Sequence, residues 1–284
     1  MKNCIPSNVD KRTKLYKELE RYQEYLYEKN LAENTVTSYL GAVRQYYRRY
    51  RKITPQNLQM HRVMLIDKYA PGTANIRIRA MSQYLKFLDI DDVVLPLIKV
   101  QRRMQLENVI SQADYEYLKR RLWEDEKFNY YFAVRCMAAT GVRVSELVKF
   151  QVEDVARGFK DIHSKGDKVR RIYIPKTLRI AMAEWLEGEG RDHGRLFLNN
   201  IGDPMSESAI RCQLKAFSGQ YQLAPECMYP HSFRHRFAIS FIEQCGDISL
   251  LANLLGHENL ETTRIYLRRS STEQYQIVNK VVNW

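Results

Sequence analysis

The chain has no apolar stretch that could serve as a signal peptide or cross a membrane. Its N-terminus is polar, and no apolar run comes near the roughly eighteen residues that a spanning helix needs. The five cysteines are an odd, widely spaced set without a Cys-x-x-Cys pair. This pattern argues against a disulfide framework or a structural zinc site and fits a reducing compartment. We therefore expect a cytoplasmic protein that uses neither a membrane nor a metal.

Acidic residues are too few to balance the basic ones. The chain has 33 Asp and Glu against 45 Lys and Arg, which gives a net charge of +12 and a pI near 9.4. This surplus favours a polyanionic partner, nucleic acid first and an acidic membrane surface second. Internal repeats and low-complexity tracts are also missing. At 284 residues the chain is long for one small core and predicts two domains.

The first part of the chain has the periodicity of amphipathic helices. After a flexible N-terminus at 1–10, helical spacing of apolar residues predicts an all-α domain of four helices over 11–90. Asn34 or Thr35 would cap the second helix, and Thr54 followed by proline would open the third. Basic side chains on the second and fourth helices predict phosphate contacts, although each alone is typical of a solvated surface: Arg44, Arg48, Arg51, Arg77, Arg79 and Lys86.

A change in composition at 91–106 predicts an interdomain linker, whose basic end carries Arg102 and Arg103. The remainder, 107–284, is expected to be mainly α with one β-hairpin turning at Gly166-Asp167. Ser111 predicts a helix start. The helices that we expect to follow cover 126–140, 144–150, 176–188, 206–218, 231–244, 247–256, 258–268 and, at the C-terminus, 271–282.

Four separated segments carry groups suited to phosphodiester chemistry. They are TGVRVSEL at 140–147, HSFRH at 231–235, LGH at 255–257 and Tyr266, nine residues after the last histidine. Arginine can hold a phosphate bidentately, imidazole can move protons, and a tyrosine hydroxyl can act as a covalent nucleophile. Together with the SKG segment at 164–166, this order and spacing resemble the tyrosine recombinase (phage integrase) family.

The resemblance implies a role for each matched residue. Arg143 and Arg234 would clamp the scissile phosphate, with Glu146 and His235 in support. His231 and His257 would hydrogen-bond the phosphate, and His231 is favoured as the proton acceptor from the nucleophile.

Lys165 would protonate the departing 5′ oxygen, and Tyr266 would form a 3′-phosphotyrosyl link, without metal, ATP or another cofactor. Two alternatives stay open: Lys168 competes as the hairpin lysine, and Tyr275 is a second tyrosine near the C-terminus. The second is disfavoured because its spacing from the LGH segment does not fit.

The resemblance also implies partners and a fold. The chain is similar to the compact two-domain members, Xer-type or TnpI-type cointegrate resolvases, which lack an additional N-terminal arm-binding domain. The resemblance implies a four-helix DNA-binding domain and a mixed α/β catalytic domain at 107–284. It also implies duplex DNA as substrate and a homotetramer that exchanges strands through a Holliday junction. A bacterial, nucleoid-associated location is expected.

Two other functions compete with recombination: a non-catalytic DNA-binding accessory protein and a type IB topoisomerase. The sequence leaves three points open: the DNA target, the choice among integration, excision and resolution, and any need for an accessory or second recombinase protein.

Overall fold

The computed structural model describes residues 8–100, 108–163, 169–257, 259–267 and positions 275, 278, 279 and 282, with side chains from residue 15 onward. Its contacts divide the chain into two compact units, Met1–Arg102 and Arg103–Trp284. The division falls inside the predicted linker 91–106. Arg102 and Arg103 lie outside the described residues.

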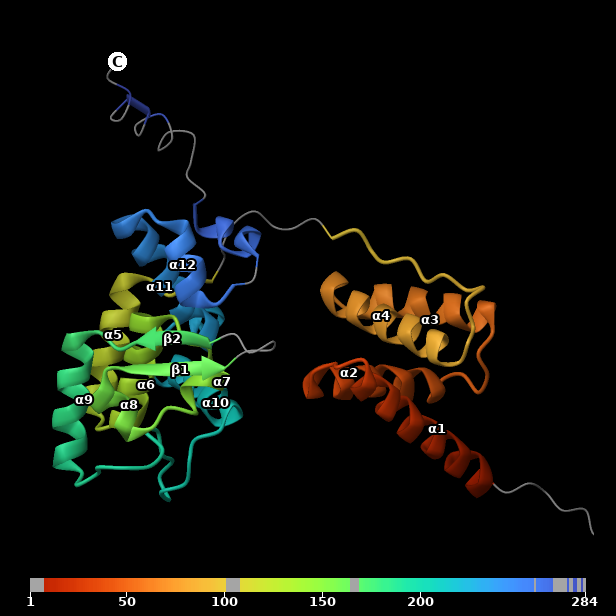
Figure 1. Ribbon diagram of the computed structural model, residues 1–284, viewed down its shortest axis with the longest axis horizontal. Coiled ribbons are helices and arrows are strands. Elements are labelled where there is room, and N and C mark those ends of the chain that lie inside the picture. Colours follow the sequence, from red (N-terminus) through yellow and green to blue (C-terminus); the bar gives the residue numbers. More distant parts are fainter. Residues whose placement is uncertain are drawn as a thin grey trace, which may run out of the picture. The chain divides into compact units, whose positions relative to one another are not determined.

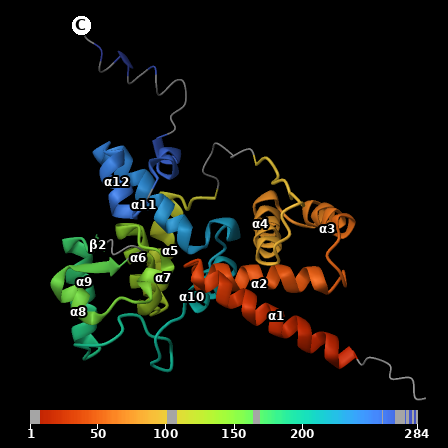
Figure 2. The same cartoon turned by 45° about the vertical axis from the view of Figure 1, so that its right-hand side comes forward.

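The first unit consists of four helices that close around one core, as Figures 1 and 2 show in red to orange. Its centre is aromatic as well as aliphatic, with Tyr22, Tyr46 and Tyr84 fully buried. The helices are α1 (Asn8–Glu28), α2 (Glu33–Tyr47), α3 (Pro55–Lys68) and α4 (Pro71–Phe87).

The ends of these helices only partly follow the sequence prediction. The Thr54 hydroxyl accepts from the Asn57 backbone N–H at 3.2 Å, as predicted for the cap of α3. The prediction for α2 was wrong: Ala32 occupies the N-cap position, and the helix begins before Asn34. A stretch of the predicted linker also packs on this unit, because the Asn75 amide bonds to both backbone groups of Ile98 at 2.8 and 2.9 Å.

His61 is a buried histidine without a hydrogen-bond partner among the described residues. It is 1% exposed and lies edge-on to Tyr46 and Tyr50. Burial, and then the charges of Arg49 and Arg77, lower its pKa from 6.5 to about 4. The folded protein therefore holds His61 neutral at pH values where an unfolded chain would protonate it.

We expect His61 to make folding stability depend on pH. Because its folded pKa is depressed, stability is lost as pH falls from 6.5 and levels off near pH 4, by about 3 kcal/mol. Thermal unfolding of full-length protein across this range should be less pH-dependent in His61→Leu than in the wild type. His163→Leu, at an exposed position, is the matched control. Equal pH dependence in wild type and His61→Leu would contradict this account.

The second unit is mainly helical, with one two-stranded sheet in the part of it that the structure describes. The hairpin is antiparallel, with Phe159 opposite Tyr173 and His163 opposite Val169. Its turn, 164–168, lies outside the described residues. The elements are α5 (Gln112–Glu124), α6 (Phe128–Thr140), α7 (Val144–Leu147), α8 (Val152–Arg157), β1 (Phe159–His163), β2 (Val169–Tyr173), α9 (Lys176–Gly188), α10 (Glu207–Gln220), η1 (Pro225–Cys227), α11 (Pro230–Cys245), α12 (Ile248–Leu255), η2 (Leu260–Thr262) and η3 (Arg264–Leu267).

This arrangement confirms the predicted fold class, with two local differences. Helix α8 was not predicted. The α-helix expected at 258–268 is not formed by the described residues 259–267, which make two separate 3₁₀ turns, η2 and η3. The predicted helix at 271–282 lies almost wholly outside the described residues.

The core of the second unit positions the motif segments. Helix α11 packs on α6, and α12 lies beside both α11 and β2, so segments far apart in sequence meet (Figures 1 and 2). Phe233 of the HSFRH segment is fully buried in this core. Burial of that ring directs its helical neighbours Arg234 and His235 toward α12 and η3, where they make their hydrogen bonds.

Candidate active site

The TGVRVSEL segment comprises the last residue of α6, the turn after it and all of α7. Gly141 ends α6 with a left-handed φ of 63°, and a Cβ there would lie 2.4 Å from the Phe237 ring. Only glycine fits this turn, and it places Arg143 at the N-cap of α7. The Arg143 side chain keeps 36% of its surface exposed, so its guanidinium remains accessible from solvent.

Three arginines converge on the C-terminal end of α12, where helix carbonyls lack partners within the helix. Each arginine donates to one of three successive carbonyls, which we call the α12 end. Arg170 donates to Leu254 at 3.0 Å, Arg234 to Leu255 at 2.6 Å and Arg143 to Gly256 at 3.0 Å. The partial negative charge of a helix C-terminus favours cations there, so the α12 end offsets part of the repulsion among the three guanidinium groups.

Glu146 is the carboxylate of this cluster. It accepts from the Arg143 guanidinium and backbone N–H, each at 2.9 Å, and from Arg170 at 2.5 Å. Burial disfavours its ionised form, but the charges of Arg170 and Arg143 outweigh burial and hold the pKa of Glu146 below its usual value. Glu146 therefore stays ionised and fixes both arginines.

Arg234 and His257 form the buried side of the site. Arg234, 3% exposed, donates to the Gly141 carbonyl and, at 3.1 Å, to Nε2 of His257. Burial, then the charges of Arg143 and Arg170, lower the pKa of Arg234 to about 10, which leaves it charged at neutral pH.

The hydrogen bonds of His257 define its tautomer. Arginine can only donate, so Nε2 of His257 accepts from Arg234, and the ring proton resides on Nδ1, 2.8 Å from the hydroxyl of buried Thr263. Burial and the Arg234 charge lower the pKa of His257 to about 4. The ring is therefore neutral at pH 7, consistent with this bonding pattern.

Tyr266 lies in η3 and is 8% exposed. Its hydroxyl is 2.7 Å from Nδ1 of His235. Burial raises the pKa of Tyr266 to about 12, with the Arg234 charge acting in the opposite direction, and burial lowers the pKa of His235 to about 4. A neutral phenol therefore donates to a neutral imidazole. His231, favoured from the sequence as the acceptor, is exposed on the first turn of α11, and no hydrogen bond among the described residues joins it to Tyr266.

The structure places the other predicted residues as follows. Lys165 and its alternative Lys168 lie outside the described residues, so the choice between them stays a prediction. Tyr275 is 68% exposed. Arg77 is held inward by Gln45 and the Tyr69 ring, unlike the exposed candidates of the first unit: Arg44, Arg48, Arg51, Arg79 and Lys86.

Two residues of the cluster were missed by sequence reasoning. Arg170 lies in a predicted strand just after the hairpin lysines, and the alternating pattern of that strand is equally typical of a surface cation. Thr263 lies in a run of polar residues. No sequence signal marked Thr263. For Arg170, the available signal was that neighbouring strand residues point to opposite faces, so Arg170 and Arg171 cannot both lie on the same face.

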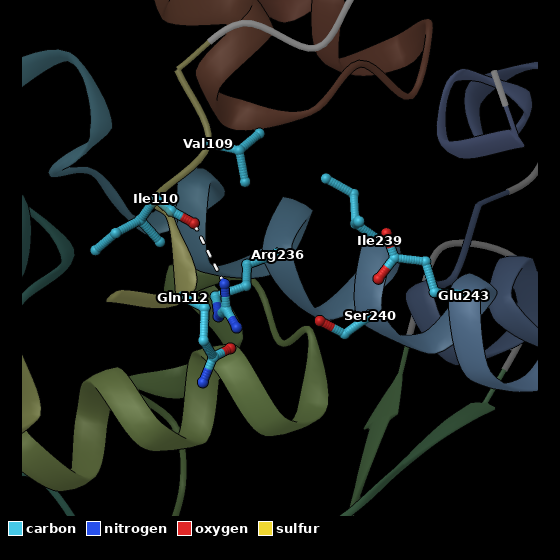
Figure 3. Close-up of a pocket in the computed structure, with 7 residues that line it drawn as sticks. All are labelled: Val109, Ile110, Gln112, Arg236, Ile239, Ser240 and Glu243. Carbon is cyan, nitrogen blue, oxygen red and sulfur yellow. Dashed lines mark hydrogen bonds between the residues drawn. The ribbon is translucent and has the colours of Figure 1, made fainter. Parts of the chain in front are cut away.

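A separate pocket of about 360 Å³ lies where the segment before α5 meets α11 (Figure 3). Arg236 donates to the Ile110 carbonyl across it at 3.4 Å. None of the predicted catalytic residues lines it. Over the described part of the chain, no three acidic, cysteine or histidine side chains are grouped to hold a metal ion, and no helix is long and apolar enough to span a membrane.

The sequence matches a known protein family. A model of the phage integrase family matches residues 102–273, which is more than half of the chain. The chain therefore belongs to the phage integrase family, whose members are tyrosine recombinases. This confirms the family and the class of DNA strand-transfer enzyme predicted from the motifs.

Similar proteins include a tyrosine recombinase, a resolvase and a transposon integrase. Tyrosine recombinase XerC of Lactobacillus delbrueckii is 26% identical, with 87% of this chain and 92% of the relative covered. TnP I resolvase of Bacillus thuringiensis is 25% identical, covering 92% and 98%. Among solved structures, the Tn1549 transposon integrase in complex with transposon right end DNA superposes with a TM-score of 0.71 at 15% identity, covering 93% of this chain and 99% of that one. That likeness supports the fold.

Proposed function

We propose that this protein is a site-specific recombinase that cuts and rejoins duplex DNA through a 3′-phosphotyrosyl intermediate. The observation that carries the proposal is the meeting of Tyr266 and His235 with the arginine cluster at the α12 end. The Arg234 charge reaches both groups, since it shifts the pKa of Tyr266 and of His235. Nucleophile and phosphate clamp would thus act on one phosphodiester.

The charge of the cluster suits the reaction. Three arginines (Arg143, Arg170 and Arg234) less one carboxylate (Glu146) leave a net charge of 3 − 1 = +2. A phosphodiester carries one negative charge and gains a second as the nucleophile adds. Fixed cations aimed at that developing charge stabilise the transition state more than the ground state.

In the proposed step, the Tyr266 oxygen attacks phosphorus as its hydroxyl proton passes to an imidazole. His235 is the acceptor that the observed hydrogen bond favours, in place of His231. A bound phosphate would raise the pKa of His235, because an opposite charge stabilises imidazolium. Lys165 would protonate the departing 5′ oxygen. The phosphotyrosyl bond keeps the energy of the broken bond, so a 5′-hydroxyl of another strand can attack it and restore the tyrosine.

The assembly remains part of the proposal. Two DNA sites would be held by four protomers, exchanging one strand pair to form a Holliday junction and then the other. Exposed basic residues in and just after α2, and on α4, would contact the phosphate backbone: Arg44, Arg48, Arg51, Arg79 and Lys86. The similarity to TnP I resolvase and XerC favours resolution of cointegrates or replicon dimers in the cytoplasm of a bacterium, with or without an accessory protein.

Replacing His235, whose imidazole is hydrogen-bonded to Tyr266, should show whether His235 or His231 accepts the proton. We expect His235→Asn to slow single-turnover strand cleavage about 100-fold, because a proton acceptor is lost, while DNA affinity stays unchanged. His193→Asn, at an exposed site, is the control. If His235→Asn cleaves at the control rate and His231→Asn is slow, His231 is the acceptor and the assignment is wrong.

Capture of the covalent intermediate tests the function as a whole. Fragments of the replicon that carries the gene would be incubated with protein in EDTA, denatured and sequenced after recovery of protein-linked DNA. The mapped site would then be made as a duplex with a nick beside the cleavage position, which traps the adduct. Adduct at one defined sequence supports recombination. Binding without adduct would favour an accessory protein, and adduct scattered over unrelated sequences would favour a topoisomerase.

A further inference from the structure

Arg170 occupies a place in the site that none of the family motifs quoted above includes. It lies in β2, one residue before exposed Arg171, yet its side chain is only 9% exposed because successive strand residues point to opposite faces. Its two terminal nitrogens contact two other segments. One donates to Glu146 of α7, and the other to the Leu254 carbonyl in the last turn of α12.

Arg170 also packs closely against Gly256. Gly256 has a left-handed φ of 62°, and a Cβ on it would lie 2.8 Å from Cδ of Arg170. The arginine thus packs against the backbone turn that places His257, and its bond to Glu146 reaches the carboxylate that holds Arg143. The Arg170 side chain therefore connects the hairpin, the Glu146–Arg143 pair and the turn before His257.

We propose that Arg170 is a positioning residue for strand cleavage, which fixes Arg143 through Glu146 and ties the hairpin carrying the predicted lysine to the turn before His257. This inference rests on the proposed recombinase function. Arg170 itself is too enclosed to be the main phosphate ligand, and its effect would come through the groups that it holds.

The experiment compares Arg170→Met and Arg170→Lys with Arg171→Met in the full-length protein. Arg171 is the matched control: it loses the same charge from the next residue of the strand, where it pairs with Asp161 on the exposed face. The probe is the nicked duplex mapped by the wild-type adduct, made with either a normal phosphate or an uncharged methylphosphonate at the cleavage position.

We expect Arg170→Met to bind the normal duplex like the wild type but to cleave it about 100-fold more slowly, since misplacing a reacting group by about an ångström costs that much. Arg170→Lys keeps the charge but cannot span both partners, so it should cleave about 10-fold more slowly. On methylphosphonate DNA the loss of cleavage rate in Arg170→Met should shrink to a few-fold, because the uncharged group leaves less negative charge for Arg143 to stabilise. A purely structural role would slow both substrates equally.

Each outcome bears on the inference. Cleavage by both Arg170 variants at the Arg171→Met rate, or an equal loss on the two substrates, would overturn it. If Arg170→Met does not fold, Arg170→Lys decides by the same two measurements. Failure of the proposed function looks different, because wild type and Arg171→Met would then also form no adduct.

Discussion

Tyr266→Phe should abolish strand cleavage while leaving DNA binding intact. Removal of one oxygen deletes the proposed nucleophile, and no other described tyrosine hydroxyl contacts His235. We expect cleavage of the nicked duplex to fall by at least about 10⁴-fold, to the background of the assay, as for loss of a covalent nucleophile. The aromatic ring of Tyr266 is buried, and phenylalanine keeps that ring. The packing of η3 on α11 should therefore be preserved, and the melting temperature should change little.

Tyr275→Phe is the matched control for that result. It removes the same hydroxyl from a tyrosine that is 68% exposed and joins no described hydrogen bond. Cleavage and binding should both equal those of the wild type. Cleavage that persists in Tyr266→Phe and disappears in Tyr275→Phe would move the nucleophile to Tyr275 and contradict the assignment made here.

Arg143→Ala should cause the second largest loss. Arg143 is the most exposed guanidinium of the cluster and is already held by Glu146 and the Gly256 carbonyl, so it needs little reorganisation to meet a phosphate. We expect cleavage to slow about 10²- to 10³-fold, the usual cost of removing one donor from a preorganised oxyanion site. DNA affinity should fall only slightly, because most contacts lie elsewhere along the backbone.

Arg120→Ala controls for loss of a positive charge from the same unit. Arg120 is exposed on α5 and pairs with Glu124 on its own helix, where such pairs contribute little. Single-turnover cleavage and filter binding would be measured side by side for both variants. A loss in Arg143→Ala that appears entirely in binding, with cleavage of bound DNA unchanged, would contradict a role at the scissile phosphate.

The sequence predicted the parts of the site that local patterns define. Gly141 and Gly256 end helices with left-handed conformations, and these turns place Arg143 and His257, so short motifs carry much of the geometry. Helical periodicity likewise predicted the four helices of the first unit, and strand-like alternation predicted the hairpin of the second.

The rest depends on partners distant in sequence. The burial of Arg170 follows from Glu146, 24 residues earlier, and from Leu254, 84 residues later. The His235 bond to Tyr266 spans 31 residues. The same reason applies to 258–268, where the bond between Thr263 and His257 favours tight turns over a continuous helix. No local pattern specifies such pairings.

The central claim is that Tyr266 becomes covalently joined to a DNA 3′ phosphate. The most direct measurement is mass spectrometry of the wild-type adduct, trapped on the nicked duplex in EDTA and digested with protease and nuclease. We predict a nucleotide mass on the peptide that contains Tyr266, together with a free 5′-hydroxyl at the cleaved end. A nucleotide on any other peptide, or a phosphate left on the 5′ end, would contradict the account.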